Sequence, residues 1–218
     1  MALKAVLAGA TGLIGSELLN TLLNEATYNQ VTVIARSSTG MVHPKLKEVI
    51  VDFDELNKHA KEITGHAVFC CLGTTRKKTP DMGVYRKIDH DYPVKLAELA
   101  AKNGMDQYHL VSSMGANSQA SSYYLRFKGE TEEDVKKAGV KGVFIYRPGF
   151  LIGDRKERRP MEKLLKVISV IVDPLLFGSL KKYRSTQAKD VARAMFNQSI
   201  KNNEGIFVYP SDKIKELA

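Results

Sequence analysis

The residues of this chain whose types and spacing could do chemistry are a tyrosine and a lysine four positions apart, Tyr124 and Lys128. On a helix, such a pair lies on one face, one turn above the other. A tyrosine hydroxyl has a reference pKa of about 10, and a neighbouring ammonium favours its phenolate form. The pair could therefore exchange a proton with a substrate near neutral pH. The same spacing also occurs by chance, as an ordinary packed or solvated pair.

Two serines precede this pair at a position that suits the same reaction. Ser112 and Ser113 directly follow residues 107–111, which predict a strand, and a helix is expected from about 121 to 138. A serine at the end of that strand could hold a carbonyl oxygen against the tyrosine.

A glycine-rich turn near the start of the chain, Gly9-Ala-Thr-Gly-Leu-Ile-Gly15, could bind a phosphate group. It lies between a predicted strand at 4–8 and a segment at 17–25 that carries leucines at helical spacing. Glycine permits a sharp bend and a close ligand, and the N-terminus of the following helix favours an anion. The spacing GxxGxxG differs from the common dinucleotide pattern GxGxxG, and a strand-to-helix turn without a ligand would look similar. The surrounding strand and helix nevertheless favour nucleotide binding.

The end of the second predicted strand, residues 30–35, bears on which nucleotide binds. An acid about 20 residues after the glycines would bind the ribose of NAD, but no acid occurs there. Arg36 stands there instead, followed by two serines, and its guanidinium could pair with a 2′-phosphate. The segment therefore favours NADP over NAD, with a solvent-facing arginine as the alternative.

Strand-like and helix-like segments alternate along the whole chain. Predicted strands cover 4–8, 30–35, 48–51, 66–72, 107–111, 140–146 and 205–209, and predicted helices cover 17–25, 83–102, 121–138 and 186–200, with a final turn at 212–217. The helix at 83–102 could be interrupted at Pro93. This alternation indicates an α/β, Rossmann-type, doubly wound and mostly parallel sheet flanked by helices. Ligands bind at the carboxyl edge of such sheets.

Three short loops at that edge are further candidates for ligand contacts. Asp52-Phe53 end the third predicted strand and could border an adenine, although a turn capped by Asp52 would look the same. Gly73-Thr74-Thr75 follow a nearly continuous apolar strand and suit a backbone lying against a cofactor. Arg147-Pro148-Gly149 make a fixed turn after the strand at 140–146.

The chain after residue 150 is expected to form a small substrate or lid portion of the same domain. A basic loop at 154–159 leads to a predicted helix at 161–172, which is apolar around much of its circumference and needs a cover. That cover could be the domain's own sheet, a partner subunit, or the substrate site.

Composition and charge limit the classes of function. The 218 residues, 44% hydrophobic and 26% charged, suit one domain over 1–218, as a monomer or a homodimer. The net charge of +9 fits a solvated surface, or a phosphate-rich cofactor or acidic substrate. No nucleic-acid-binding pattern accompanies it, so no specific nucleic-acid partner is expected.

Targeting and cysteine patterns add further expectations. The apolar start runs straight into the glycine turn and leaves no room for a signal peptide, so a cytoplasmic location is expected. No apolar stretch reaches the roughly 18 residues that span a bilayer. The adjacent Cys70 and Cys71 predict reduced core residues, with neither a disulfide framework nor a metal site.

Taken together, the glycine turn, the serine pair, Tyr124 with Lys128, and Arg147-Pro-Gly149 resemble the short-chain dehydrogenase/reductase superfamily in its atypical branch. Within it, the chain is similar to the Tat-interacting-protein-like oxidoreductases, which are related to the NmrA-like NAD(P)-binding proteins. The resemblance covers almost the whole chain. Less general motifs that match are Cys71-Leu-Gly-Thr-Thr-Arg-Lys-Lys78, Lys87-Ile-Asp-His-Asp-Tyr-Pro93, and Tyr209-Pro-Ser211 with Ile214.

The resemblance implies a role for each matching residue. Tyr124 would be the catalytic tyrosine, and Lys128 would tune it and hold the nicotinamide ribose. The catalytic serine falls on Ser113 or Ser112; Ser113 is preferred, although spacing alone does not decide. The implied cofactor contacts are Gly9, Thr11, Gly12, Leu13, Ile14 and Gly15 at the pyrophosphate, Arg36 at the 2′-phosphate, Leu72, Gly73 and Thr74 at the inner ribose, and Pro148 and Phe150 at the nicotinamide. Asp52, Phe53 and Ser112 complete the set of candidate cofactor residues.

The sequence thus predicts an NADP(H)-dependent oxidoreductase that transfers a hydride between the nicotinamide and a carbonyl or alcohol substrate through Ser113, Tyr124 and Lys128. The main alternative is a regulatory or scaffold protein that binds NADP(H) without catalysis. A nucleic-acid-binding protein is a third reading. The region after Gly153 is shorter than the substrate lobe of extended family members, which leaves the substrate open.

Overall fold

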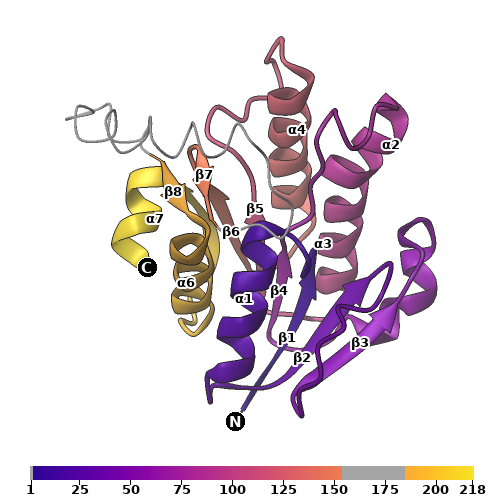
Figure 1. The fold of residues 1–218 in the computed structure, drawn as a ribbon, viewed down its shortest axis with the longest axis vertical. Helices are drawn as coiled ribbons and strands as arrows, with labels where there is room; N and C mark the ends of the chain where they lie inside the picture. Colours follow the sequence, from indigo (N-terminus) through magenta and orange to yellow (C-terminus); the bar gives the residue numbers. More distant parts are fainter. Residues whose placement is uncertain (1, 154–184) are drawn as a thin grey trace.

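The computed structural model describes residues 2–153 and 185–218, in which a central sheet is covered by helices on both faces (Figure 1). The strands of this sheet are β1 (Leu3–Ala8), β2 (Tyr28–Ala35), β3 (Leu46–Ile50), β4 (Ala67–Cys70), β5 (Gln107–Val111), β6 (Gly142–Arg147) and β9 (Gly205–Pro210). Their order is β3-β2-β1-β4-β5-β6-β9, and all neighbouring pairs run parallel. The predicted Rossmann-type, doubly wound fold is confirmed.

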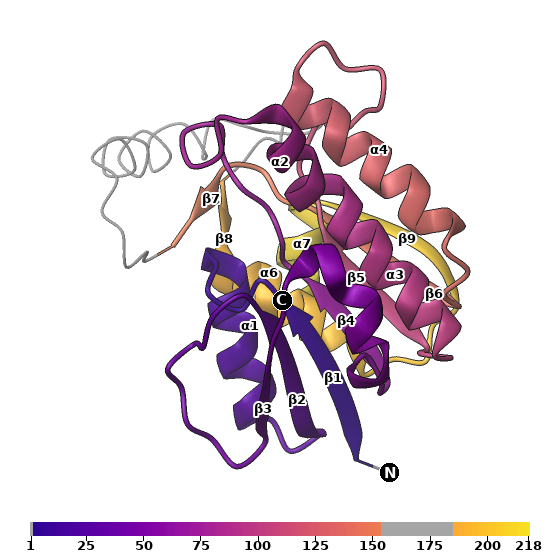
Figure 2. The same ribbon diagram turned by 90° about the vertical axis from the view of Figure 1, so that its right-hand side faces the viewer.

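Helices cover the two faces of the sheet in separate layers, which Figure 1 shows to the left and right of the strands and Figure 2 shows from the side of α3. One layer consists of α1 (Leu13–Asn24), α6 (Ala188–Ser199) and α7 (Ser211–Leu217), whose buried side chains share one core. The other layer contains a 3₁₀ helix (Phe53–Glu62), α3 (Tyr92–Lys102) and α4 (Tyr123–Lys137), which share a second core. A separate parallel ladder joins β7 (Leu151–Ile152) to β8 (Thr186–Gln187).

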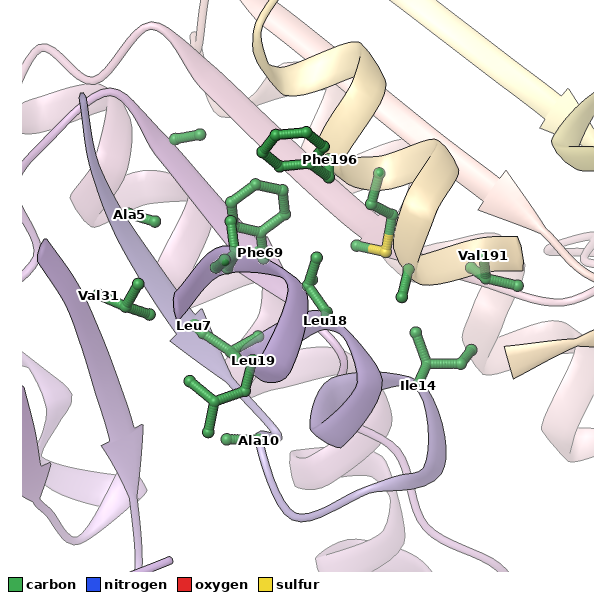
Figure 3. Close-up of a cluster of buried hydrophobic side chains, with 14 of the residues drawn as sticks. Ala5, Leu7, Ala10, Ile14, Leu18, Leu19, Val31, Phe69, Val191 and Phe196 are labelled. Carbon is green, nitrogen blue, oxygen red and sulfur yellow. The ribbon is translucent and has the colours of Figure 1, made fainter. Parts of the chain in front are cut away.

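Successive side chains of the central strands point alternately into the two cores. In β1, Leu7 packs beneath α1, whereas Val6 belongs to the opposite core, and both are fully buried. Figure 3 shows Leu7 and Phe69 of the sheet beside Leu18 of α1 and Phe196 of α6. Because these strands are covered on both faces, they read in the sequence as continuous apolar runs rather than alternating ones.

The paired cysteines follow the same alternation. Cys70 belongs to the core under α3, and Cys71 packs against the core under α1. Both are free thiols, and burial raises the pKa of each. They are core residues on opposite faces of the sheet, as predicted.

The helix predicted at 83–102, for which an interruption at Pro93 was allowed, is divided in the structure. The chain instead forms α2 (Met82–Arg86), a π-helical turn (Lys87–Asp91) and α3, which carries Pro93 in its first turn. A proline has no N–H for the carbonyl four residues earlier, and its ring crowds that carbonyl. The helix is therefore interrupted just before Pro93, and the carbonyl released is that of Asp89.

Smaller differences occur at element ends. Helix α1 begins at Leu13 rather than 17, residues 186–187 form strand β8 instead of helix, and the 3₁₀ helix after β3 was not predicted. The expected loop at 154–159 and helix at 161–172 lie outside the described residues. Within the described ranges, no helix combines the length and apolar character that crossing a bilayer requires.

His109 of β5 is a titratable side chain placed inside the core. Its ring stacks on those of Phe69 and Phe144, with ring centroids 4.8 Å and 4.5 Å away. Nδ1 lies 3.1 Å from the Tyr146 hydroxyl and Nε2 lies 2.9 Å from the Gln107 side-chain oxygen. Burial lowers the pKa of His109 to about 3, so the ring is neutral.

This burial makes the protein's stability sensitive to acid. Below pH about 6.5, His109 is protonated in the unfolded chain but stays neutral in the folded protein, so the free energy of unfolding decreases as the pH falls. Replacing His109 by Phe should reduce the slope of the unfolding free energy between about pH 6 and about pH 4 by about 1.4 kcal/mol per pH unit. Urea unfolding of both proteins across this range measures that slope; equal slopes would contradict the assignment.

Candidate functional site

The predicted site residues gather where the central strands end. The loops after β1, β4, β5 and β6, which are neighbours in the sheet, all leave from its carboxyl edge. Helix α4 begins beside the same edge and carries Tyr124 and Lys128 (Figure 2). The site is thus built from segments that are far apart in the sequence.

The glycine turn is held by close backbone contacts. Gly9 has φ +86°, and a Cβ there would lie 2.5 Å from the carbonyl oxygen of Cys71. A Cβ on Gly15 would lie 2.0 Å from the carbonyl oxygen of Gly9. The Gly12 N–H donates to the same Gly9 oxygen at 3.0 Å. Glycine is therefore required at 9 and 15, because the turn, α1 and the β4 loop meet without room for side chains.

The N-terminus of α1 is available to an anion. Gly12 is its N-cap, so no side chain caps the helix, and its first turn contains no acidic residue. The first N–H groups of a helix have no partner within it and carry the positive end of its dipole. This arrangement, with the tight glycine backbone beside it, fits a pyrophosphate group.

Tyr124 and Lys128 lie one turn apart on α4 but differ in exposure. The Tyr124 side chain is 39% exposed, whereas Lys128 is only 5% exposed. The Lys128 ammonium lies 3.0 Å from Oδ1 of Asp89 and 3.5 Å from the carbonyl oxygen of Leu72. Burial by itself would lower the pKa of this lysine, but the Asp89 carboxylate and the Tyr124 phenol outweigh burial and raise it. A buried ammonium therefore stands below an exposed phenol.

Asp89 is a site residue that the sequence reasoning missed. It lies on the π-helical turn and is 1% exposed. Its Oδ2 accepts the Thr74 N–H at 2.9 Å, and its main-chain carbonyl accepts the Thr131 hydroxyl at 2.8 Å. One signal in the sequence pointed to Asp89. Pro93, four residues later, lies in the same motif, Lys87-Ile-Asp-His-Asp-Tyr-Pro93, which supports the family resemblance.

The structure distinguishes the two serines by their hydrogen bonds. Ser112 is 4% exposed, and its hydroxyl donates to Oε1 of Glu132 at 2.5 Å. Arg147 donates to both oxygens of the same buried carboxylate, from Nε at 2.9 Å and Nη2 at 2.5 Å. Within the described part of the chain, the hydroxyl of the half-buried Ser113 makes one long bond of 3.3 Å, to the carbonyl of Met114. Ser113 thus has the more available hydroxyl, and Glu132 is a second residue that the sequence did not reveal.

At the opposite end of the site, Arg36 follows β2 and is exposed. Among the described residues, no carboxylate lies within 4.0 Å of its guanidinium. Asp52 accepts the Asp54 N–H at 2.9 Å and caps the 3₁₀ helix, as its alternative reading proposed. Phe53 is buried and packs on the ring of Tyr92, with centroids 5.3 Å apart.

The turn after β6 lies beside the serine loop. The Met114 N–H donates to the carbonyl of Pro148 at 3.0 Å, and the Thr186 N–H donates to that of Phe150 at 2.8 Å. The Phe150 side chain is 41% exposed. Further on, a Cβ on Gly153 would lie 2.7 Å from a methyl carbon of Leu13 in α1. The segment 147–153 therefore runs from the serines back to the glycine turn.

These contacts bring most of the predicted site together. The glycine turn touches the β4 loop, and a Cβ on Gly73 would lie 3.5 Å from Asp89 and 3.6 Å from Lys128. Met114, which follows Ser113, donates to the carbonyl of Pro148. Arg36, Asp52 and Phe53 lie after the outer strands β2 and β3. No three His, Cys, Asp or Glu side chains in the described ranges gather as metal ligands would.

Comparison with known proteins places this site in a family. Residues 9–199 match the NAD(P)H-binding family. The rat protein HTATIP2 is 37% identical over 90% of this chain and 81% of its own length, and the Aspergillus fumigatus protein "fmp52, mitochondrial" is 34% identical over 97% and 93%.

Solved structures resemble this chain in fold. MoeE5, solved in complex with UDP-glucose and NAD, superimposes with a TM-score of 0.72, at 18% identity over 94% of this chain and 74% of its own. The UDP-N-acetylglucosamine 4-epimerase of Methanobrevibacter ruminantium gives 0.70, at 17% identity over 96% and 76%. Identity this low shows the shared fold alone. By its family match and its sequence relatives, the chain belongs to the NAD(P)H-binding family, with the Tat-interacting-protein-like HTATIP2 and with fmp52 among its relatives.

Proposed function

We propose that this protein is an NADP(H)-dependent oxidoreductase acting on a carbonyl or alcohol substrate. The observation that carries the proposal is the buried ammonium of Lys128, one helical turn from the exposed phenol of Tyr124, at the sheet edge that also bears the glycine turn. A bound nicotinamide would supply or accept the hydride. The chain itself would move the proton and orient the oxygen.

Each role follows from the surroundings of the side chain. Tyr124 exchanges the proton with the substrate oxygen, because its hydroxyl is accessible and a cation lies next to it. Ser113 orients that oxygen, because its hydroxyl has only one long hydrogen bond. Lys128 places a positive charge beside the Tyr124 side chain and holds the nicotinamide ribose. Pro148 and Phe150 border the ring.

The remaining cofactor contacts extend along the edge of the sheet. Backbone at Gly9, Gly12 and Gly15, with the first N–H groups of α1, holds the pyrophosphate. The inner ribose lies against Leu72, Gly73 and Thr74. Arg36 binds a 2′-phosphate, since it is exposed after β2 where an NAD-specific site would carry an acid.

Location and assembly stay predictions. Cytoplasmic location was expected from the absence of a leader pattern, whereas the fungal relatives carry the word mitochondrial in their names. The expected monomer or homodimer is tested by sedimentation of the purified chain.

Replacing Tyr124 by Phe should lower kcat/KM by a factor of about 10² to 10⁴, because the substrate oxygen loses its proton donor. The dissociation constant of the cofactor should not change. Tyr123→Phe is the matched control, since Tyr123 is the adjacent exposed tyrosine with its ring under Arg126. Assay on a panel of aldehydes and ketones measures both variants. Full turnover by Tyr124→Phe would contradict the proposal, and cofactor binding without any wild-type turnover would favour a regulatory role.

The two serines should respond in opposite ways. Ser113→Ala should lower kcat/KM by about tenfold or more with an unchanged melting temperature, because only substrate orientation is lost. Ser112→Ala should cost about 1 to 3 kcal/mol of stability, since it leaves a buried carboxylate short of a hydrogen bond. Thermal unfolding and steady-state kinetics on both variants separate these effects. The reverse pattern would assign the reaction to Ser112.

Arg36→Ala should weaken NADPH binding by about tenfold or more and leave NADH binding nearly unchanged, because a charge-assisted contact to the 2′-phosphate is lost. Calorimetric titration with both cofactors measures the ratio. An equal effect on the two would show that Arg36 does not discriminate between them.

A further inference from the structure

Asp89 belongs to no predicted role, yet it is the most deeply buried acid at the site, together with Glu132. We propose that Asp89 is a positioning residue, which fixes the side chain of Lys128 at the sheet edge and keeps it charged. The proposal rests on the proposed function for the meaning of that charge in the reaction. The charge itself can be tested without a substrate.

The first support is the geometry of the carboxylate. One oxygen contacts the Lys128 ammonium at 3.0 Å, and the other accepts the Thr74 N–H at 2.9 Å. Asp89 and Lys128 are 1% and 6% exposed at their side chains. Asp89 therefore links the lysine of α4 to the loop after β4, where the backbone of a cofactor site is expected.

The second support is the reason that Asp89 faces inward. Pro93 cannot donate to the Asp89 carbonyl, and the π-helical turn widens the helix at this point. The carbonyl instead accepts the hydroxyl of Thr131, which lies one turn after Lys128 on α4. The carbonyl of Asp89 thus binds Thr131 and its carboxylate binds Lys128, and both contacts hold the π-helical turn against α4.

The third support is the balance of charge around the ammonium. The titratable groups that face it are Tyr124 of α4, Tyr85 of α2, Asp89 of the π-helical turn, and the thiols of Cys70 and Cys71. Burial raises the pKa of Tyr85 to about 12 and raises the pKa of both thiols. Asp89 is the sole carboxylate among these groups. An ammonium this buried would favour its neutral form if the carboxylate were absent.

The geometry also leaves the lysine able to bind a ligand. An ammonium has three N–H donors. The ammonium forms an ion pair with Oδ1 of Asp89 at 3.0 Å, and it donates one long hydrogen bond of 3.5 Å to the Leu72 carbonyl oxygen. Among the described residues, no other acceptor contacts this ammonium, which leaves an N–H group for a ribose hydroxyl or for the Tyr124 oxygen. Asp89 would therefore prepare the lysine before a cofactor arrives.

The test uses Asp89→Asn in the full chain, with Asp91→Asn as the matched control. Asp91 lies on the same turn but is exposed, and it pairs with His90 and Arg86 instead. In Asp89→Asn, the folded pKa of Lys128 should fall below its unfolded value of about 10.4. The unfolded chain then binds more protons, so the variant regains stability relative to wild type as the pH rises.

Urea unfolding from about pH 7 to about pH 10 measures this change. The ratio of the unfolding constants of Asp89→Asn and wild type should shrink by a factor approaching ten per pH unit, whereas Asp91→Asn should show a constant ratio. A constant ratio for Asp89→Asn would overturn the proposal and leave Asp89 a structural residue. This measurement needs no turnover, so its outcome is independent of the proposed reaction.

One further variant and one kinetic measurement complete the design. If Asp89→Asn does not fold, the double variant Asp89→Asn with Lys128→Met should fold, because it removes the unpaired charge. If neither variant folds, Asp89 is needed for its hydrogen bond to Thr74 rather than for the charge of Lys128, and the proposal is overturned. Where wild type turns over a carbonyl, Asp89→Asn should also shift the basic limb of kcat/KM to lower pH by about one unit or more. If the pH dependence of unfolding changes but the basic limb of kcat/KM does not, the reaction does not need the charge on Lys128.

Discussion

The close approach of the glycine turn to the β4 loop is the constraint on which the rest of the site depends. With Gly9 and Gly15 free of side chains, the first strand, the first helix and the Cys71 carbonyl meet at van der Waals distance. That contact fixes where the β4 loop runs, and so where the Leu72 carbonyl and the Thr74 N–H point. Lys128 and Asp89 each bind to this loop. A larger residue at either glycine would displace the glycine turn and the surroundings of Lys128 together.

Helix α4 organises the other half of the site through two charged residues on its buried face. Lys128 takes Asp89 as its partner, and Glu132, one turn later, takes Ser112 and Arg147. Each buried charge is therefore compensated, as burial demands. One pair ties α4 to the π-helical turn and the β4 loop, and the other ties it to the ends of β5 and β6. The segments that carry the proposed catalytic groups are held by the same helix.

The relatives explain why fold and cofactor class are better determined than the substrate. This chain matches 81% of HTATIP2 and 93% of fmp52 at 34% to 37% identity, whereas it shares only the fold with MoeE5 and the 4-epimerase, at 17% to 18% identity. A shared dinucleotide-binding sheet leaves substrate choice to the segments around its carboxyl edge. In the described part of this chain, the segments at that edge include the loop that carries Ser113 and the turn that carries the exposed ring of Phe150.

The sequence by itself determined the alternating elements, the parallel sheet, the glycine turn, and the pairing of Tyr124 with Lys128 on one helix face. All of these are local patterns, in which apolar periodicity, glycine spacing and helical geometry act within a few residues. Only the tertiary structure decided that Lys128 is buried, that its partner is Asp89 some forty positions away, and that Glu132 binds Ser112 while Ser113 stays available. Side-chain pairs between distant segments leave no periodic trace, because their partners are chosen by the packing of helix against strand. Pro93 was compatible with a continuous or an interrupted helix, and either Ser112 or Ser113 could have been the available serine. The packing of the surrounding chain decided both questions.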